Sequence, residues 1–302
     1  GTGGSEEAVI HLTKRWSEAG YKVTVYNNCP EEVVDNNGVE WKRYERFNPN
    51  DEFNILIGWR NNPFLEPKNA KQKYVDIHDV PSLIYFPEAS LKDVKVMVKS
   101  QFHRSLFPDL KDDNFGIIPN GIETKKFKNY KKEKHNLVWT SSYDRGLEYL
   151  LEMWADIRKE VPDATLDVAY GWNLFDKSPY GRSDEGKKWK DKMIQLLDQK
   201  GVTEHGRLNS KDVTKLYLKA DVWAYPTDFP EIDCITATKC MAAKAVPVTT
   251  DFAVLKERTQ GVMIEGDIKE NYTKFKNELI FVLKNEDVKE TIRNNVDVLE
   301  YE

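Results

Sequence analysis

The sequence predicts an α/β fold of two Rossmann-like domains, and three observations support this prediction. Short β-like runs alternate with amphipathic helical stretches, which is typical of mostly parallel sheets covered by helices. A lysine-rich segment, Lys125–His135, interrupts this alternation. The alternation then restarts, and each part of the 302-residue chain is long enough for one domain. We therefore expect domains at residues 1–130 and 131–302, which face a central cleft where the carboxyl ends of the strands bind ligands.

The first half begins with a glycine loop that leads into a helix with apolar residues at Val9, Ile10, Leu12 and Trp16. Such a loop normally follows a strand in α/β folds. No strand precedes the glycine loop here, and the last residues of the chain end without a clear helix cap. We therefore expect that the sequence is trimmed at both ends and lacks the first strand. The β-like runs that follow the helix are "YKVTVYN", "VEWKRY", "FNILIGW", "KYVDIHD", "VKVMVKS" and "FGIIPNG".

The segment Lys125–His135 has five lysines in its first eight residues and no apolar periodicity. A solvated linker is the simpler interpretation, and a basic patch is the alternative. The second half then continues with a helix over residues 145–161, which has Leu147, Leu150 and Trp154 on one side. The other strands and helices expected there are "NLVWTSS", "ATLDVAYGW", "EGKKWKDKMIQLLDQKG", "VTEHGRL", "SKDVTKLYLKAD", "VWAYPT" and "PVTTD".

Composition narrows the class of protein. A formal net charge of −5 argues against nucleic-acid binding, which needs a basic face. No apolar run approaches the roughly 18 residues of a membrane span, so any membrane contact is expected to be peripheral. No signal peptide is recognisable. The three cysteines, Cys29, Cys234 and Cys240, show no metal-binding spacing and make a poor disulfide framework, which favours a reducing, cytoplasmic location.

Candidate site residues in the first half lie in loops. Gly3 and Gly4 precede a helix whose free amides could hold a phosphate, although a simple turn explains them equally well. His78 and Asp79 follow a strand, at the edge where functional groups collect in α/β folds; a structural histidine is the alternative. Asn120 belongs to an Asn-Gly turn, which needs no function.

Further candidates lie in the second half. Ser142 and Arg145 occupy a loop between a strand and a helix, where an arginine can bind a diphosphate through two hydrogen bonds. A solvated arginine is the alternative for Arg145. Arg207, after Gly206, is a further cation near the same edge.

The stretch "YPTDFPEIDCITATKCMAAKAVPVTTD" places Glu231 before a short helix and Asp233 near the helix start, as an N-cap or first-turn acid. Helix amides beside a carboxylate suit a sugar phosphate. An ordinary α/β crossover is the alternative.

These motifs together resemble retaining glycosyltransferases of the GT-B fold, of the family 4 type that uses nucleotide-sugars. The matching motifs are "GGSEE", "IPNGIE", "DRGLEYLL" and "PEIDCITATKCMAAKAVPVTT", in the family's order and over most of the chain from about Gly3 to Asp251. Any one of them is unspecific, but their order makes the resemblance strong.

The resemblance implies that a nucleotide-diphospho-sugar is the donor and that no metal or cofactor is needed. His78 would face the transferred sugar, Glu231 would hold its hydroxyls, and Arg145 would neutralise the leaving diphosphate. Gly3, Gly4, Ser142, Arg207 and the amides of Ile232, Asp233, Cys234 and Ile235 would contact the donor, with Asp79 and Asn120 on the acceptor side. The acceptor could be a glycan, a lipid-linked molecule or a small molecule.

Three departures from the family pattern keep other functions open. Lys239 stands where the family has a second glutamate that binds the nucleotide ribose, and an ammonium group can only donate hydrogen bonds. Lys244 replaces a small residue, and "WTSS" has a serine in place of an arginine. A nucleotide-sugar-binding module without turnover and a GT-B sugar-nucleotide epimerase are therefore the alternatives to a transferase.

Overall fold

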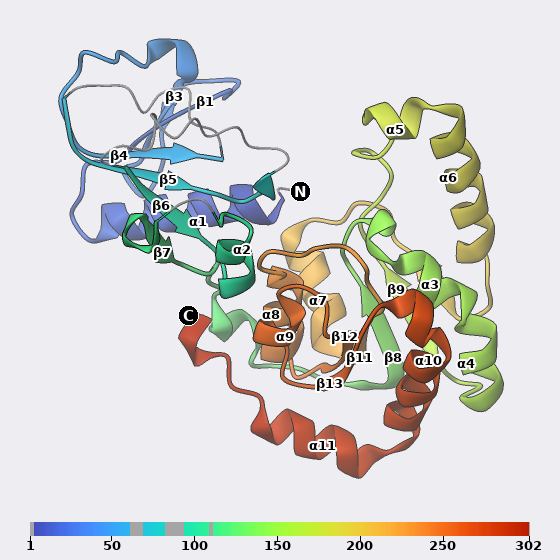
Figure 1. The fold of residues 1–302 in the computed structure, drawn as a ribbon. Coiled ribbons are helices and arrows are strands. Elements are labelled where there is room, and N and C mark those ends of the chain that lie inside the picture. Colours follow the sequence, from blue (N-terminus) through green and yellow to red (C-terminus); the bar gives the residue numbers. More distant parts are fainter. Residues whose placement is uncertain (1–2, 61–68, 82–93, 109–110, 302) are drawn as a thin grey trace. The chain divides into compact units, whose positions relative to one another are not determined.

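The computed structural model describes residues 3–60, 69–81, 94–108 and 111–301. The chain divides into two compact units, Thr2–Asn120 and Gly121–Glu302, which we call the N-terminal and C-terminal units (Figure 1). The boundary expected near residue 130 falls inside the C-terminal unit.

The N-terminal unit contains helix α1 (Gly4–Glu18), helix α2 (Gln101–Ser105) and two sheets. One sheet has the strand order β1-β3-β2 and the other has the order β4-β5-β6-β7, with every pair of the second sheet parallel. The strands are β1 (Thr24–Asn27), β2 (Val33–Val34), β3 (Glu40–Arg43), β4 (Phe53–Trp59), β5 (Ala70–Asp76), β6 (Val94–Val98) and β7 (Phe115–Ile117). Each contains part of a run that the sequence predicts as β-structure, apart from the two-residue β2.

The strand register brings polar residues to one edge of the four-stranded sheet. Trp59 pairs with Asp76, and Asp76 pairs with Met97, so β4, β5 and β6 end side by side. Val75 and Val96 are fully buried in the core beneath this edge. The residues that follow each strand therefore meet above an apolar base.

The C-terminal unit contains a six-stranded, all-parallel sheet with the order β10-β9-β8-β11-β12-β13. Its strands are β8 (Glu133–Trp139), β9 (Thr165–Val168), β10 (Val202–Glu204), β11 (Ala220–Tyr225), β12 (Val246–Thr250) and β13 (Val262–Ile264). Its helices are α3 (Leu147–Glu152), α4 (Trp154–Glu160), α5 (Pro179–Arg182), α6 (Asp184–Leu197), α7 (Ser210–Lys219), α8 (Ile235–Ala242), α9 (Leu255–Arg258), α10 (Ile268–Lys284) and α11 (Glu286–Asn295).

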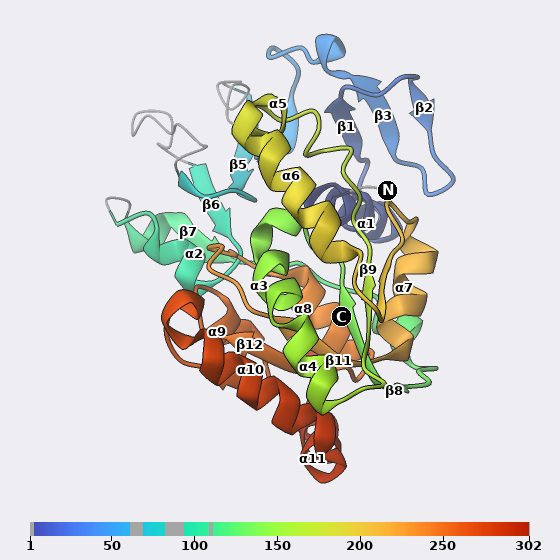
Figure 2. The ribbon, with the colours of Figure 1, turned by 90° about the vertical axis from the view of Figure 1, so that its right-hand side faces the viewer.

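Helices cover both faces of this sheet, with α3, α4 and α10 on one face and α7 and α8 on the other (Figures 1 and 2). Every residue of β11 and β12 is therefore buried, as expected for central strands of a parallel sheet. The helix expected over residues 145–161 is divided at Met153, whose N–H still bonds the carbonyl of Tyr149 at 3.3 Å, and the two parts are α3 and α4.

The lysine-rich segment is not a linker. Residues Thr124–Phe127 form a 3-10 helix, and β8 begins within the segment at Glu133. Phe127 is buried, and the Lys132 ammonium donates to the carbonyl of Tyr217 at 3.2 Å. Burial lowers the pKa of Lys132 to about 7. The segment is thus packed onto the C-terminal unit, because its aromatic ring and the aliphatic stem of Lys132 bury apolar surface.

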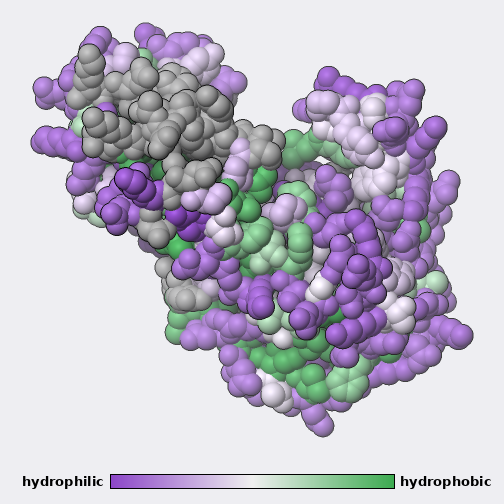
Figure 3. Space-filling view, viewed as in Figure 1, coloured by the Kyte–Doolittle hydropathy of each residue, from purple (hydrophilic) through white to green (hydrophobic). Residues whose placement is uncertain are grey.

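The face of the molecule seen in Figure 3 is mostly hydrophilic, in line with a chain in which 31% of the residues are charged. Among the described helices none is long and apolar enough to cross a membrane.

Candidate active site

A glycine brings Arg145 close to the loop that follows β11. Arg145 ends a short 3-10 helix after β8, and Gly146 follows it with a φ of 109°. A Cβ atom on Gly146 would lie 2.1 Å from the carbonyl oxygen of Pro226, so only glycine permits this approach. Because β8 and β11 are neighbours in the sheet, their loops leave the same edge and meet here.

Arg145 and Glu231 form an ion pair at this edge. The Nη1 of Arg145 donates to Oε1 of Glu231 at 2.9 Å, and the hydroxyl of Tyr225 donates to the same oxygen at 2.8 Å. The guanidinium also stacks on the Phe229 ring, with its carbon 4.2 Å from the ring centroid. The Arg145 side chain is 35% exposed and that of Glu231 is 9% exposed, so the arginine can still meet a ligand.

The electrostatics of this pair favour a permanently charged arginine. Burial alone would lower the pKa of Arg145, but the charge and hydrogen bond of Glu231 outweigh that effect and raise the pKa above its ordinary value. A charged guanidinium with one side exposed is suited to bind phosphate oxygens.

The opening of α8 is held by a second ion pair. Arg258 donates to the Asp233 carboxylate at 2.5 Å and to the Asp233 carbonyl at 3.0 Å, and both side chains are buried. The prediction that Asp233 is the N-cap or a first-turn acid of this helix is wrong: the N-cap is Cys234, which has a φ of 53° and gives no side-chain hydrogen bond to the helix. The Arg258 contacts fix the carbonyl of Asp233, so the loop can hold that left-handed conformation before Ile235 begins the helix.

Arg207 lies over a tyrosine at the end of β9. Its guanidinium carbon is 4.9 Å from the centroid of the Tyr170 ring. Gly171 has a φ of 77°, and a Cβ atom there would lie 2.8 Å from the amide nitrogen of Arg207, so glycine again permits a close approach between loops. The half-buried Ser142 begins the 3-10 helix that ends at Arg145, and its carbonyl accepts from the Arg145 N–H at 3.2 Å.

The two unusual lysines have different environments. Lys239 is half-buried on α8 and shares the less buried helix face with Ile235 and Ala242. Lys244, after α8, has a φ of 61°, and its ammonium donates to the carbonyls of Arg293 and Val296 at 2.8 and 3.1 Å. Lys244 therefore caps the carboxyl end of α11, which offsets the cost of its backbone conformation.

A separate polar cluster lies at the carboxyl ends of β4, β5 and β6 in the N-terminal unit. Nε2 of His78 is 3.4 Å from Oδ1 of Asp76, and the ammonium of the buried Lys99 bonds the same oxygen. The His78 ring stacks on Trp59 with 4.2 Å between centroids. Burial alone would raise the pKa of Asp76, but His78 and Lys99 outweigh it and lower that pKa.

Asp79 is held by neighbouring residues. Arg60 donates to both of its carboxylate oxygens at 2.6 Å, and the Nε2 of His103 lies 3.1 Å from its carbonyl oxygen. Burial lowers the pKa of His103 to about 4, so this ring is neutral at pH 7. Nη1 of Arg60 also lies 3.3 Å from Oε1 of Glu6 in the first turn of α1. The structure thus joins the loop after β5 to the start of α1.

The remaining predicted residues, Gly3, Gly4 and Asn120, belong to the N-terminal unit. Gly3 is the N-cap of α1 and Gly4 is its first residue, so the helix starts inside the predicted glycine loop. Asn120 is half-buried and ends the N-terminal unit.

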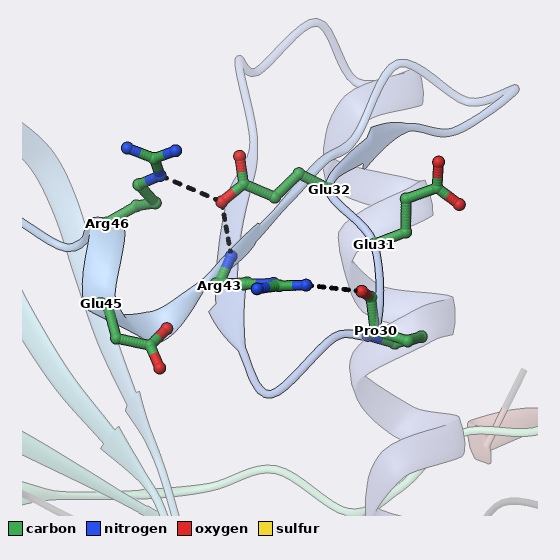
Figure 4. Close-up of a pocket in the computed structure, with 6 residues that line it drawn as sticks. All are labelled: Pro30, Glu31, Glu32, Arg43, Glu45 and Arg46. Carbon is green, nitrogen blue, oxygen red and sulfur yellow. Dashed lines mark hydrogen bonds and ion pairs between the residues drawn. The ribbon is translucent and has the colours of Figure 1, made fainter.

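An open pocket of about 440 Å³ in the N-terminal unit contains none of the predicted site residues (Figure 4). It is lined by Pro30, Glu31, Glu32, Arg43, Glu45 and Arg46. Arg43 donates to the Pro30 carbonyl at 2.9 Å and Arg46 donates to Glu32 at 3.3 Å. Within the described part of the chain, no three His, Cys, Asp or Glu side chains are grouped to hold a metal ion.

Residues 121–297 match the family model described as Glycosyl transferases group 1. The chain belongs to this family. It is therefore a glycosyltransferase by family, and the matched residues include Arg145, Arg207, Glu231 and Lys239. A search of curated proteins finds no match.

Solved structures show that this glycosyltransferase has the GT-B fold, as the sequence predicts. A glycosyltransferase from Rickettsia africae is 15% identical, with a TM-score of 0.68 over 98% of this chain and 92% of that one. HepE from Anabaena, in complex with UDP and glucose, is 14% identical, with a TM-score of 0.65 over 99% of this chain and 94% of its own. TarM from S. aureus, in complex with fondaparinux, α-GlcNAc-glycerol and UDP, is 15% identical, with a TM-score of 0.53. The match covers 78% of this chain but 49% of TarM.

The sequence patterns missed three residues that the structure adds to these groups: Tyr225, Phe229 and Arg60. Tyr225 is the last residue of β11, and the position at a strand end is the signal that could have identified it. The ring of Phe229 and the pairing of Arg60 with Asp79 depend on contacts that no local pattern encodes.

Proposed function

We propose that the protein is a retaining glycosyltransferase of the family 4 type. It transfers a hexosyl group from a nucleotide-diphospho-sugar to an acceptor hydroxyl, without a metal ion or another cofactor. The observation that carries the proposal is the Arg145–Glu231 pair, in which a charged, partly exposed guanidinium lies beside a carboxylate at the carboxyl edge of a parallel sheet.

In this proposal the C-terminal unit binds the donor. Arg145 neutralises the diphosphate, and the amides at the start of α8, from Ile232 to Ile235, add hydrogen bonds to the sugar or the phosphates. Ser142, Arg207 and Lys239 complete the donor site. Arginine and helix amides supply the electrostatic stabilisation for which other transferases use a metal ion.

Glu231 contacts the transferred sugar. The bond between the anomeric carbon and the donor phosphate oxygen breaks, and a bond from the acceptor oxygen forms on the same face. The acceptor proton leaves with a phosphate oxygen. A carboxylate near the anomeric carbon supports the positive charge that develops there, and it orients the sugar hydroxyls by accepting their hydrogen bonds.

The N-terminal unit supplies the acceptor-side residues in this proposal. His78, held by Asp76 and Trp59, is assigned to the reacting sugar, and Asp79 and Asn120 are assigned to the acceptor. Gly3 and Gly4, at the start of α1, are assigned to the diphosphate. We propose a glycan, lipid-linked or small-molecule acceptor and a cytoplasmic location with at most peripheral membrane contact.

The donor nucleotide is best sought first among UDP-sugars, because HepE and TarM are described with UDP. The test is a binding and turnover screen with UDP-, GDP- and ADP-glucose, with product analysis and Glu231→Gln as the inactive control. We expect at least one donor to release its sugar with retained anomeric configuration. We expect Glu231→Gln to lower turnover roughly 100-fold, as the loss of one preorganised electrostatic contact does, while affinity for the bare nucleotide changes little.

Other products would replace the proposal. An isomerised donor would identify an epimerase. Tight donor binding without any turnover would identify a binding module, and Lys239 in place of the ribose-binding glutamate is the feature that favours this second function. Inverted product would exclude the retaining mechanism, and equal turnover by Glu231→Gln and the parent protein would remove Glu231 from the site.

A further inference from the structure

The ring of Tyr225 packs against two tryptophans. Tyr225 ends β11 and is fully buried. Its centroid lies 4.9 Å from the Trp139 ring, at the end of neighbouring β8, and 5.0 Å from the Trp223 ring on its own strand. Both tryptophans are also fully buried. Close packing against both tryptophans in the buried core restrains the ring, so the direction of the phenol hydroxyl is restrained as well.

The Tyr225 hydroxyl is part of a short hydrogen-bond chain. It donates to Oε1 of Glu231 at 2.8 Å, and that oxygen also accepts from Arg145. Burial and then the charge of Glu231 raise the pKa of Tyr225 well above its ordinary value, so the phenol keeps its proton. A phenol that keeps its proton serves as a fixed donor to the carboxylate.

Two donors therefore meet on one oxygen of Glu231. Arg145 donates to Oε1 at 2.9 Å, beside the bond from Tyr225. Among the described residues, Oε1 of Glu231 accepts both of these hydrogen bonds and Oε2 accepts neither. The carboxylate plane is thus set by Tyr225 and Arg145 together, which leaves Oε2 to accept a hydrogen bond from a ligand.

We propose that Tyr225 is a positioning residue that orients Glu231 so that Oε2 accepts a hydroxyl of the transferred sugar. This inference rests on the proposed function, in which Glu231 contacts that sugar. Tyr225 acts only through Glu231, whereas Arg145 contacts the diphosphate directly. The loss of the Tyr225 hydroxyl should therefore reduce recognition of the sugar and leave recognition of the nucleotide unchanged.

Tyr225→Phe tests this inference because it removes one oxygen and keeps the stacked ring. Calorimetry with UDP and with UDP-glucose measures how much the glucose adds to affinity. We expect Tyr225→Phe to reduce that added affinity about 5- to 10-fold, within the range for the loss of one ordinary hydrogen bond, and to leave UDP affinity within about twofold. If the parent transfers glucose, kcat should fall by a similar factor and KM for the acceptor should not change.

Tyr149→Phe is a matched control. The Tyr149 hydroxyl donates to the Asp228 carboxylate at 3.1 Å, so this variant also removes a phenol bond to a carboxylate of the same loop. Its affinities for UDP and UDP-glucose should equal those of the parent. A thermal unfolding measurement on both variants checks that the fold is intact.

A crystal structure of unliganded Tyr225→Phe gives a readout that needs no donor. The Glu231 carboxylate should leave its parent rotamer or become disordered. An unchanged rotamer, or unchanged affinity for both ligands in a parent that prefers UDP-glucose, would overturn the inference. An equal loss of UDP and UDP-glucose affinity would also overturn it, because the hydroxyl would then be structural. A parent that shows no preference for any glucose nucleotide over its bare nucleotide would instead contradict the proposed function.

Discussion

Each unit places an ion pair at the carboxyl ends of parallel strands, and the two pairs differ in how far they are buried. In the N-terminal unit the Lys99 side chain is 1% exposed and its partner Asp76 is 11% exposed. In the C-terminal unit the Arg145 side chain is 35% exposed, beside a nearly buried Glu231. A buried lysine cannot meet a ligand without large rearrangement, whereas the arginine can bind an anion while it keeps its partner.

The difference indicates that similar ion pairs serve different purposes. Lys99 and Asp76 hold the loop that carries His78, and their mutual charge compensation makes burial tolerable. Arg145 is held by Glu231 and Phe229 but keeps donors available for a diphosphate. Three predictions test this contrast, from the largest expected effect to the smallest.

The first prediction concerns Lys99→Met. Without the Lys99 ammonium, the buried Asp76 carboxylate has less positive charge beside it to balance its own charge. The free energy of unfolding of the N-terminal unit should therefore fall by about 3–5 kcal/mol. Hydrogen exchange of the β5 and β6 amides measures this loss without assuming that both units unfold together.

Lys284→Met is the control for Lys99→Met. Lys284 bonds Glu160 at 2.6 Å, but both side chains are about half exposed, at 48% and 50%. Its loss should change stability far less than Lys99→Met, because exposed ion pairs contribute little. A loss below about 1 kcal/mol in Lys99→Met would show that the buried pair contributes no more than a surface pair.

The second prediction concerns Arg145→Ala. It should weaken UDP binding by about 1.5–3 kcal/mol, since the diphosphate loses charged hydrogen bonds. Calorimetry measures the loss, and the exposed Arg182→Ala serves as a control of equal charge change. Unchanged UDP affinity in Arg145→Ala would remove Arg145 from the donor site.

The third prediction concerns Lys239, one helical turn after Ile235 at the start of α8. If its ammonium helps to hold the diphosphate, Lys239→Glu should weaken UDP binding by about 0.5–1 kcal/mol and affect uridine less, and added salt should reduce the difference. Lys239→Met, which removes the charge without reversing it, should have a smaller effect. Tighter uridine binding in Lys239→Glu would instead indicate a lost ribose contact, and no change in either ligand would place Lys239 outside the site.

Local patterns predicted most of the strands and helices because periodicity and turn residues act over a few neighbouring positions. The run Phe53–Trp59 is a strand over its full length, and the run "EGKKWKDKMIQLLDQKG" contains most of α6. The prediction of a linker at the lysine-rich segment is wrong because the many charged residues around Phe127 give no apolar periodicity. Phe127 is nevertheless buried, and its ring contacts Tyr217 in α7. A sequence window does not contain that partner.

The sequence by itself determined the α/β elements, the order of the glycosyltransferase motifs and the residue types that suit a sugar nucleotide. Only the tertiary structure decided which of those residues meet. Arg145 and Glu231 lie 86 residues apart in the chain, and they pair because β8 and β11 are neighbours in the sheet and Gly146 lets their loops touch. Strand order depends on how whole elements bury their apolar faces against each other, and that packing is not encoded in the local periodicity of any single element.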